Sequence, residues 1–340
     1  MNWKDNLNIL SKLNAFKLRN AFWLWYSYHV SKNSQKAWMK GMPMSVSIEP
    51  TTSCNLRCPE CPSGLRSFSR PIGMLVPETF TEMLVQLQES LIYMLFYFQG
   101  EPYLNRQFLD LVKIAHEHNI YTATSTNAHY LDDATAKKTV ESGLDRLIIS
   151  IDGTSQSTYE QYRIGGKLEK VIEGTENIIR WKKKLNSSTP HVIFQFLVVK
   201  PNEGDIPEIY QLAKRLGVDE VKLKTAQIYD YENGSPLIPD NPKYSRYRRL
   251  ANGLYRIKNK MLNQCWKMWH SCVITWDGRV VPCCFDKDAQ HQLGKLKESK
   301  FADIWQGKAY NKFRSKLLKS REEIDICTNC TEGTKIWTEE

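Results

Sequence analysis

Short apolar, β-branched runs alternate with amphipathic stretches between residues 44 and 224 of this 340-residue chain. Short apolar runs predict strands, and apolar positions that recur with the helical period predict helices. The predicted strands are 45–49, 91–98, 121–125, 146–151, 192–199 and 220–224, and the helices between them are 77–89, 106–118, 132–142, 168–184 and 206–216. This alternation is typical of a parallel sheet, open or curled into a barrel. Gly143 and Gly217 stand where helices are expected to end.

The pattern changes after this alternating region. Residues 230–242 are rich in proline, glycine, asparagine and aspartate, which indicates a linker. The next stretch, 243–262, holds seven basic residues and no acid, and we predict a helix there. Further on we expect strands at 273–276 and 280–281, joined by a turn at Asp277-Gly278, and a basic helix near 301–320. The predicted divisions are an N-terminal segment 1–41, a core 42–230, a linker with a basic helix 231–262, and a C-terminal domain 263–340.

Residues 1–41 combine seven basic residues and eight aromatic ones with a single acid, Asp5. Leu7, Leu10, Leu13 and Phe16 recur every three residues, as on one face of a helix. A basic, aromatic-rich amphipathic segment suits an anionic membrane surface. The alternative is a helix that packs its aromatic face on the main domain and leaves its lysines in solvent.

Composition narrows the class of protein. An apolar content of 41% excludes a disordered chain. No apolar run reaches the ~20 residues that span a bilayer, and no signal-peptide pattern is evident. We therefore expect a cytoplasmic protein, with peripheral contact at the inner face of the membrane through residues 1–41 as the alternative. The formal charge is +10, but no nucleic-acid-binding signature accompanies the basic stretches, so we expect no nucleic-acid partner.

The nine cysteines fall into two groups, which in a reducing compartment indicates metal binding rather than disulfides. Cys54, Cys58 and Cys61 directly follow the first predicted strand. Three thiolates on one loop can hold three irons of a 4Fe–4S cluster and leave the fourth iron open. An open metal position is typical of catalytic sites. The alternatives are a zinc site without its fourth ligand, or three buried thiols.

This C-x3-C-x2-C spacing resembles the defining motif of the radical S-adenosylmethionine (SAM) superfamily. In that family SAM chelates the open iron, and electron transfer yields methionine and a 5′-deoxyadenosyl radical that abstracts a hydrogen atom from substrate. The resemblance covers residues 44–224 and implies an α/β fold, a partial (β/α)6 radical SAM barrel.

Further segments support the resemblance. Phe98-Gln-Gly-Glu-Pro is similar to the family's Gly-Gly-Glu-Pro, with Gln99 in place of the first glycine, and Ala128 stands where a glycine is common. The resemblance assigns SAM binding to Gly100, Glu101, Asn127, Ser150, Asp152 and Arg163. All of these except Arg163 fall at the carboxyl ends of predicted strands, where parallel barrels build active sites. The alternatives are a helix cap at Glu101, turns at Asn127 and Asp152, and a solvated charge at Arg163.

The second cysteine group resembles the SPASM extension of radical SAM enzymes, in its shortened one-cluster form called twitch. The resemblance implies a small C-terminal cysteine-rich domain with a second, auxiliary 4Fe–4S cluster on Cys265, Cys283, Cys327 and Cys330. A four-cysteine zinc site is the alternative. Cys272 and Cys284 are left over, either as donors of a hydrogen atom to a substrate radical or as small buried side chains.

We therefore expect a radical SAM oxidoreductase that abstracts hydrogen from an unidentified substrate and oxidises it with the help of the auxiliary cluster. A redox-neutral epimerase using Cys272 or Cys284, and a peptide-modifying maturase, are alternatives. A non-catalytic iron–sulfur or zinc module is the alternative from another class. The expected partners are an electron donor such as flavodoxin or ferredoxin, and a small molecule, glycan or lipid precursor rather than a peptide.

Overall fold

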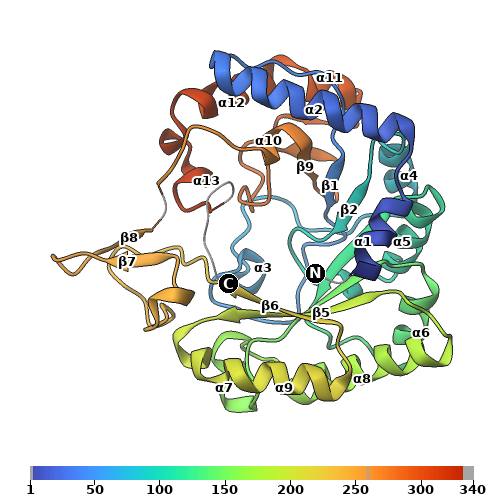
Figure 1. Ribbon diagram of the computed structural model, residues 1–340, viewed down its shortest axis with the longest axis vertical. Helices are drawn as coiled ribbons and strands as arrows, with labels where there is room; N and C mark the ends of the chain where they lie inside the picture. Colours follow the sequence, from blue (N-terminus) through green and yellow to red (C-terminus); the bar gives the residue numbers. More distant parts are fainter. Residues whose placement is uncertain (1–2, 259, 332–340) are drawn as a thin grey trace.

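The computed structural model describes residues 3–258 and 260–331. A nine-stranded sheet has the order β11-β10-β9-β1-β2-β3-β4-β5-β6, and β1 to β6 run parallel to their neighbours (Figure 1). The strands of the main sheet are β1 (Ser45–Ile48), β2 (Tyr93–Phe96), β3 (Tyr121–Thr126), β4 (Arg146–Ser150), β5 (His191–Val198), β6 (Glu220–Thr225), β9 (Ser271–Ile274), β10 (Arg279–Val281) and β11 (Gly294–Lys295). The six parallel strands confirm the predicted partial barrel.

Helices cover the outer side of the curved sheet (Figure 1). Aromatic side chains such as Phe80, Phe96 and Phe108 pack between the sheet and its helices, with ring centroids 5.5 and 6.0 Å apart. The helical elements are α1 (Trp3–Ser11), α2 (Ala15–Ser34), α3 (Pro62–Leu65), α4 (Pro77–Val85), η1 (Pro102–Leu104), α5 (Phe108–Glu117), α6 (Asp133–Glu141), α7 (Gln156–Tyr162), α8 (Leu168–Lys184), η2 (Lys200–Asp205), α9 (Ile206–Leu216), η3 (Pro242–Tyr244), α10 (Lys267–His270), α11 (Phe301–Trp305), α12 (Lys308–Lys319), η4 (Arg321–Glu323) and α13 (Asp325–Thr328). The predicted helix-ending glycines, Gly143 and Gly217, both take a positive φ, at 77° and 79°.

The C-terminal region joins the barrel sheet directly. Strand β9 pairs in parallel with β1, so that Ser45 lies opposite Ser271. The predicted turn between β9 and β10 is confirmed: Gly278 has a φ of +84° and its N–H donates to the Thr275 carbonyl over 2.9 Å. The sheet is therefore continuous from the core into the cysteine-rich region.

The helix predicted over residues 243–262 is wrong. This stretch forms η3 and an antiparallel hairpin, β7 (Tyr247–Arg249) and β8 (Tyr255–Ile257), which projects from the body of the protein (Figure 1). Tyr247 is buried and stacks on Tyr231 with centroids 4.4 Å apart, while Gly253, at a φ of +87°, forms the turn. The basic composition had suggested a solvated helix, but a left-handed turn residue between two tyrosines favours a hairpin.

The N-terminal segment forms two helices rather than one continuous helix. Asn14 caps α2 by accepting a hydrogen bond from the Lys17 backbone N–H over 2.8 Å. Leu7, Leu10 and Phe16 stay more than 40% exposed, so their three-residue spacing does not mark a buried face. The expectation that the aromatic face packs on the main domain is therefore wrong for most of these side chains. No helix among the described residues is both long and apolar enough to cross a bilayer.

Candidate active site

A cavity opens at the carboxyl ends of the parallel strands, and the first cysteine group forms one of its walls. The loop after β1 carries Cys54, Cys58 and Cys61, and all three line the cavity. Burial raises the pKa of the Cys54 thiol to about 12 and also raises that of Cys58. The cavity is also lined by Gly100, Glu101 and Asn127, which follow β2 and β3, and by Ser150, the last residue of β4.

Two glycines allow the cysteine loop to sit against the β2 loop. A Cβ atom on Gly64 would lie 2.5 Å from the Cys58 carbonyl oxygen, so no larger residue fits there. Gly100 has a φ of +75°, and a Cβ on it would lie 2.3 Å from the Thr51 carbonyl oxygen. The Gly100 N–H also donates a hydrogen bond to the Ser63 hydroxyl oxygen over 2.9 Å. The second glycine position of the Gly-Gly-Glu-Pro-like segment is thus sterically required, whereas Gln99 lines the cavity without a positive φ.

Glu101 is almost completely buried and already accepts several hydrogen bonds. Thr126 Oγ1 and the Asn127 N–H each donate to its carboxylate over 2.7 Å, and the Tyr103 N–H donates over 3.3 Å. It therefore caps η1, as the structural alternative expected, and also faces the cavity. A carboxylate offers about four acceptor positions, so one remains for a ligand. Burial raises the pKa of Glu101 to about 7, although the hydrogen bonds oppose the shift.

Asn127 and Ser150 connect neighbouring strand ends to the rest of the site. The Asn127 side-chain amide donates to the Asn55 side-chain oxygen over 2.7 Å, which joins the β3 end to the cysteine loop. The hydroxyls of Ser125 and Ser150 lie 3.2 Å apart. Ala128 takes a φ of 63°, a conformation in which a glycine would be unstrained.

Arg163 lines the cavity and forms an ion pair with Asp152. Its Nε pairs with the Asp152 carboxylate, and its Nη1 lies 3.8 Å from Cys58 Sγ. Asp152 is fully buried and also accepts a hydrogen bond from the Leu197 N–H over 2.7 Å. Since it contacts Arg163 from the protein side, Asp152 is placed to orient this arginine rather than to touch a ligand.

Several cavity residues were missed from the sequence. Asn55, which contacts Asn127, carries no motif signal, and Lys287 reaches the cavity wall from the C-terminal domain. A second cavity continues from the first, and the two share Glu60, Tyr97, Gln99, Tyr162, Gln195, Leu197 and Lys287. Its further walls carry Lys224, Gln227, Arg246 and Cys284. No sequence spacing indicates these residues, because they come from separate elements.

The second cysteine group gathers in the C-terminal domain. Burial raises the pKa of the Cys283 thiol, and the neighbouring thiols Cys284, Cys265 and Cys330 raise it further, while Cys265 contributes to the raised pKa of Cys327. These five thiols therefore lie near one another. Within residues 3–258 and 260–331, no three His, Cys, Asp or Glu side chains converge as ligands of a single metal ion. A 4Fe–4S cluster does not need such convergence, because each thiolate binds a different iron.

The two leftover cysteines occupy different environments. Cys272, on β9, is 1% exposed within the hydrophobic core, and burial raises the pKa of its thiol. Cys284 lines the second cavity, and Lys267 Nζ lies 3.4 Å from its sulfur. Of the two, Cys284 alone lines either of these two cavities.

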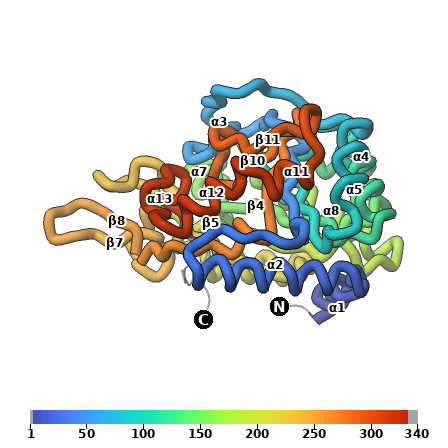
Figure 2. Tube along the Cα trace, turned by 90° about the horizontal axis from the view of Figure 1, so that it is seen from above, coloured from blue at the N-terminus to red at the C-terminus, as the bar shows by residue number. Residues whose placement is uncertain are grey.

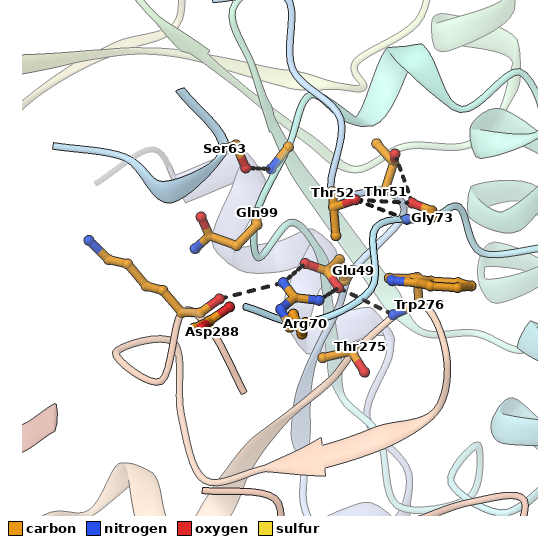
Figure 3. Close-up of polar contacts among 12 residues, drawn as sticks. Glu49, Thr51, Thr52, Ser63, Arg70, Gly73, Gln99, Thr275, Trp276 and Asp288 are labelled. Atoms are coloured by element: carbon orange, nitrogen blue, oxygen red, sulfur yellow. Dashed lines mark hydrogen bonds and ion pairs between the residues drawn. The ribbon is translucent and has the colours of Figure 1, made fainter. Parts of the chain in front are cut away.

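A buried ion pair connects the cysteine loop to the C-terminal domain. Arg70 donates two hydrogen bonds to Glu49, over 2.6 and 2.8 Å, and both side chains are nearly inaccessible (Figure 3). Arg70 also reaches the Lys287 carbonyl over 3.5 Å, and the Trp276 N–H lies 3.4 Å from the Glu49 carboxylate. The neighbouring Ser69 N–H donates to the Asp288 carboxylate over 3.0 Å. These contacts fix the C-terminal domain against the segment that follows the three cysteines.

Fold and site together define the class: a parallel β/α barrel whose strand ends face a three-thiol loop, followed by a second cysteine cluster. Residues 48–213 match the family model of the radical SAM superfamily, and residues 265–331 match that of SPASM, an iron–sulfur cluster-binding domain. The chain therefore contains a radical SAM domain and a SPASM domain. These domains imply a SAM-binding 4Fe–4S cluster, SAM itself and auxiliary iron–sulfur binding, and radical SAM enzymes require an electron donor.

Known relatives cover most of the chain. A tungsten-containing aldehyde ferredoxin oxidoreductase cofactor-modifying protein of Pyrococcus furiosus is 25% identical over 314 residues, 84% of this chain and 86% of the relative. PqqA peptide cyclase of Gluconobacter oxydans is 25% identical over 258 residues, 71% of this chain and 70% of the relative. The solved structure of anSMEcpe with bound AdoMet superposes with a TM-score of 0.64 at 17% identity, covering 88% of this chain and 89% of that one. At that identity the last similarity shows the fold alone.

Proposed function

We propose that the protein is a radical SAM enzyme that modifies a peptide, with Cys54, Cys58 and Cys61 holding the SAM-cleaving cluster. The observation that carries the proposal is the shared cavity, in which these three thiols face Glu101, Asn127, Ser150 and Arg163. The donor set fits such a cluster, since three thiolates leave one iron open. When bound, the cluster supplies the electron that cleaves SAM to a 5′-deoxyadenosyl radical.

The chain's own residues would bind and orient SAM. The Glu101 carboxylate would accept from the SAM ammonium, and Arg163 would pair with the SAM carboxylate. Asn127 and Ser150 would contact its remaining polar groups from neighbouring strand ends. Asp152 acts as a positioning residue through its ion pair with Arg163. An auxiliary cluster on Cys265, Cys283, Cys327 and Cys330 would supply one-electron redox chemistry beside the substrate cavity.

The role of Glu101 predicts a pH dependence of SAM binding. The pKa of Glu101 is raised to about 7 in the free protein, so below that pH the carboxylate is protonated and loses the negative charge that pairs with an ammonium group. We expect SAM affinity to fall about tenfold per pH unit below pH 7, because binding must first release that proton. Equilibrium dialysis with labelled SAM between pH 5.5 and 8.5 measures this slope. Glu101→Gln should bind more weakly and without the slope, and an unchanged slope in that variant would contradict the assignment.

A peptide substrate replaces the small molecule, glycan or lipid precursor that the sequence had suggested. PqqA peptide cyclase is one of the curated relatives, and its name states a peptide substrate. The second cavity carries the side-chain amides of Gln99, Gln195 and Gln227, which can donate to and accept from peptide groups. Among the described residues, those before β1 form α1 and α2 and no strand.

Hydrogen transfer from labelled substrate tests the substrate class. The reconstituted protein, with dithionite and SAM, is incubated with extract of the source cells grown in deuterated medium, and deuterium in 5′-deoxyadenosine is measured by mass spectrometry. We expect deuterium transfer from extract fractions above ~1 kDa and its loss when the extract is digested with protease beforehand. Transfer that survives digestion would show a non-peptide substrate.

Two outcomes of hydrogen abstraction compete: net oxidation of the substrate and redox-neutral return of a hydrogen atom. We propose net oxidation, since the second cysteine group can hold a redox centre near the substrate cavity. The competing assignment rests on Cys284, whose sulfur lines that cavity. In heavy water, oxidation gives product without new carbon-bound deuterium, and Cys284→Ala retains the rate within about threefold. One incorporated deuterium, lost in Cys284→Ala but not in Cys272→Ala, would establish hydrogen return instead.

A further inference from the structure

We propose that the outward face of α1 and α2 binds an anionic phospholipid surface. This face and the segment that returns along α2 carry large apolar side chains that are 39–65% exposed: Trp3, Leu7, Leu10, Phe16, Leu18, Phe22, Trp25 and Tyr26 on the helices, and Trp38 in the returning segment. The described residues include 21 exposed large apolar side chains, and these are nine of them. Exposed apolar side chains are therefore concentrated in residues 1–41, which make up only a small fraction of the chain. The Phe22 ring contacts those of Trp25 and Tyr26, and the Tyr26 ring contacts that of Trp38, so exposed apolar side chains gather on α2. Such a gathering marks an interaction site.

The orientation of α2 is the reverse of an ordinary surface helix. Its inward face carries one apolar core residue, Leu24, and four polar residues, Lys17, Asn20, Ser27 and Ser31, all of them buried. Lys17 Nζ donates to the Asn119 carbonyl over 2.8 Å, and Asn20 bonds both the N–H and the carbonyl of Met42 over 2.9 and 2.7 Å. An ordinary amphipathic helix turns its polar face to water and its apolar face to the core. Here the polar face is satisfied by the protein, so the apolar face is left for something outside it.

The two buried serines of α2 help to hold the helix in this orientation. Ser27 and Ser31 accept hydrogen bonds, each over 2.9 Å, from the N–H groups of Lys40 and Trp38 in the segment that returns along the helix. At the other end, Asp5 of α1 pairs with Arg146 and Tyr121 at the starts of β4 and β3. Side-chain hydrogen bonds and an ion pair therefore hold the exposed aromatic face in place. Its exposure is not that of a loosely attached segment.

The charges on this face select an anionic partner. Lys4, Arg19, Lys32, Lys36 and Lys40 are exposed, whereas Asp5, the acid of the segment, is buried. Lys40 Nζ lies 3.4 Å from the centroid of the Trp23 ring, and Arg19 lies 5.4 Å from that of Phe16. Tryptophan and tyrosine interleaved with lysine and arginine suit the headgroup region of a bilayer, where rings enter the interface and cations meet phosphate.

The same charges disfavour a second copy of this chain as the occupant. A two-fold interface would place the same five cations on both sides of the contact, with no exposed acid of the segment to oppose them. An anionic lipid surface instead gains from each cation, by about fivefold in affinity per basic residue.

The proposed face lies away from the active site. α1 contacts the amino ends of β3 and β4, while the thiol-lined cavity lies at the carboxyl ends of the strands. α1 and α2 run along one side of the molecule (Figure 2). Membrane contact through them would leave the cavity open to the aqueous phase, which suits a peptide substrate but does not depend on one.

Vesicle flotation of the full-length, reconstituted protein tests the proposal. At 0.1 M salt we expect flotation with vesicles of phosphatidylcholine and phosphatidylglycerol (70:30) and at least tenfold weaker binding to phosphatidylcholine alone. Lys32→Gln/Lys36→Gln/Lys40→Gln changes only exposed side chains and should weaken binding about a hundredfold, from about fivefold per charge. Phe22→Ser/Trp25→Ser should weaken it at least tenfold. The matched control, Leu185→Ser/Leu254→Ser, removes two exposed leucines elsewhere and should bind as the parent does.

Other outcomes would overturn the proposal. Equal binding to both kinds of vesicle, or no vesicle binding, would exclude an anionic lipid surface as the occupant. If Phe22→Ser/Trp25→Ser instead abolished a concentration-dependent dimer in sedimentation velocity, the face would be a contact between copies. SAM cleavage in solution should be unchanged in all these variants, which separates this proposal from the proposed function.

Discussion

Replacing Cys54, Cys58 and Cys61 together by alanine is expected to lower 5′-deoxyadenosine release at least a thousandfold. If each cysteine group holds one 4Fe–4S cluster, the protein binds about eight irons and this variant should lose about four of them. The three thiols share one cavity wall, and the three-cysteine set has no substitute nearby that could supply an equivalent donor set. Iron and sulfide analysis of anaerobically reconstituted protein, together with chromatography of the SAM products under dithionite, measures both effects.

A matched variant distinguishes the two cysteine groups. Cys327→Ala/Cys330→Ala should also lose about four irons but retain SAM cleavage, because these residues lie in the SPASM domain and are proposed ligands of the second cluster. Cys284→Ala should keep all the iron, since it is assigned to neither set. Zinc without sulfide in the parent protein, or SAM cleavage that survives loss of the first three cysteines, would overturn the assignment.

Arg70→Met is expected to lower the free energy of unfolding by about 3–5 kcal/mol, because it leaves the Glu49 carboxylate buried without its partner. The Glu49 and Arg70 side chains are 0% and 3% exposed, and the pair is joined by two hydrogen bonds. Loss of Arg70 also removes the contact with the Lys287 carbonyl and so loosens the C-terminal domain. Urea denaturation of the cluster-free protein, followed by tryptophan fluorescence, measures the change.

The same substitution at an exposed ion pair is the control. Arg180 pairs with Asp133, and their side chains are 44% and 62% exposed, so Arg180→Met should cost at most about 1 kcal/mol. Glu49→Leu/Arg70→Met should recover much of the loss of Arg70→Met, since no buried charge remains. A cost below ~1 kcal/mol for Arg70→Met would mean that water reaches Glu49 and that the pair does not fix the domain.

Local sequence patterns were sufficient to predict the strands and helices whose formation depends on residues close together in the chain. The six parallel strands and the helices between them agree with the predicted ranges to within a few residues, because each buries one face that its own apolar spacing defines. The three-cysteine loop and Gly100 lie at one edge because parallel strands all end there. The helix predicted over 243–262 is wrong because charge says little about backbone conformation, and the hairpin that forms there turns at Gly253, with a φ of +87°.

The sequence by itself determined the barrel, the thiol loop and the polar residues at the strand ends, because each is encoded within about ten consecutive residues. The tertiary structure alone decided that Cys284 and Lys287 reach the cavity while Cys272 is buried, and that Asp152 supports Arg163. It also decided that Glu49 pairs with Arg70 and that α2 turns its polar face inward. These features depend on which surfaces meet when segments far apart in the chain pack together, and hydrophobic periodicity within one segment does not record its partner.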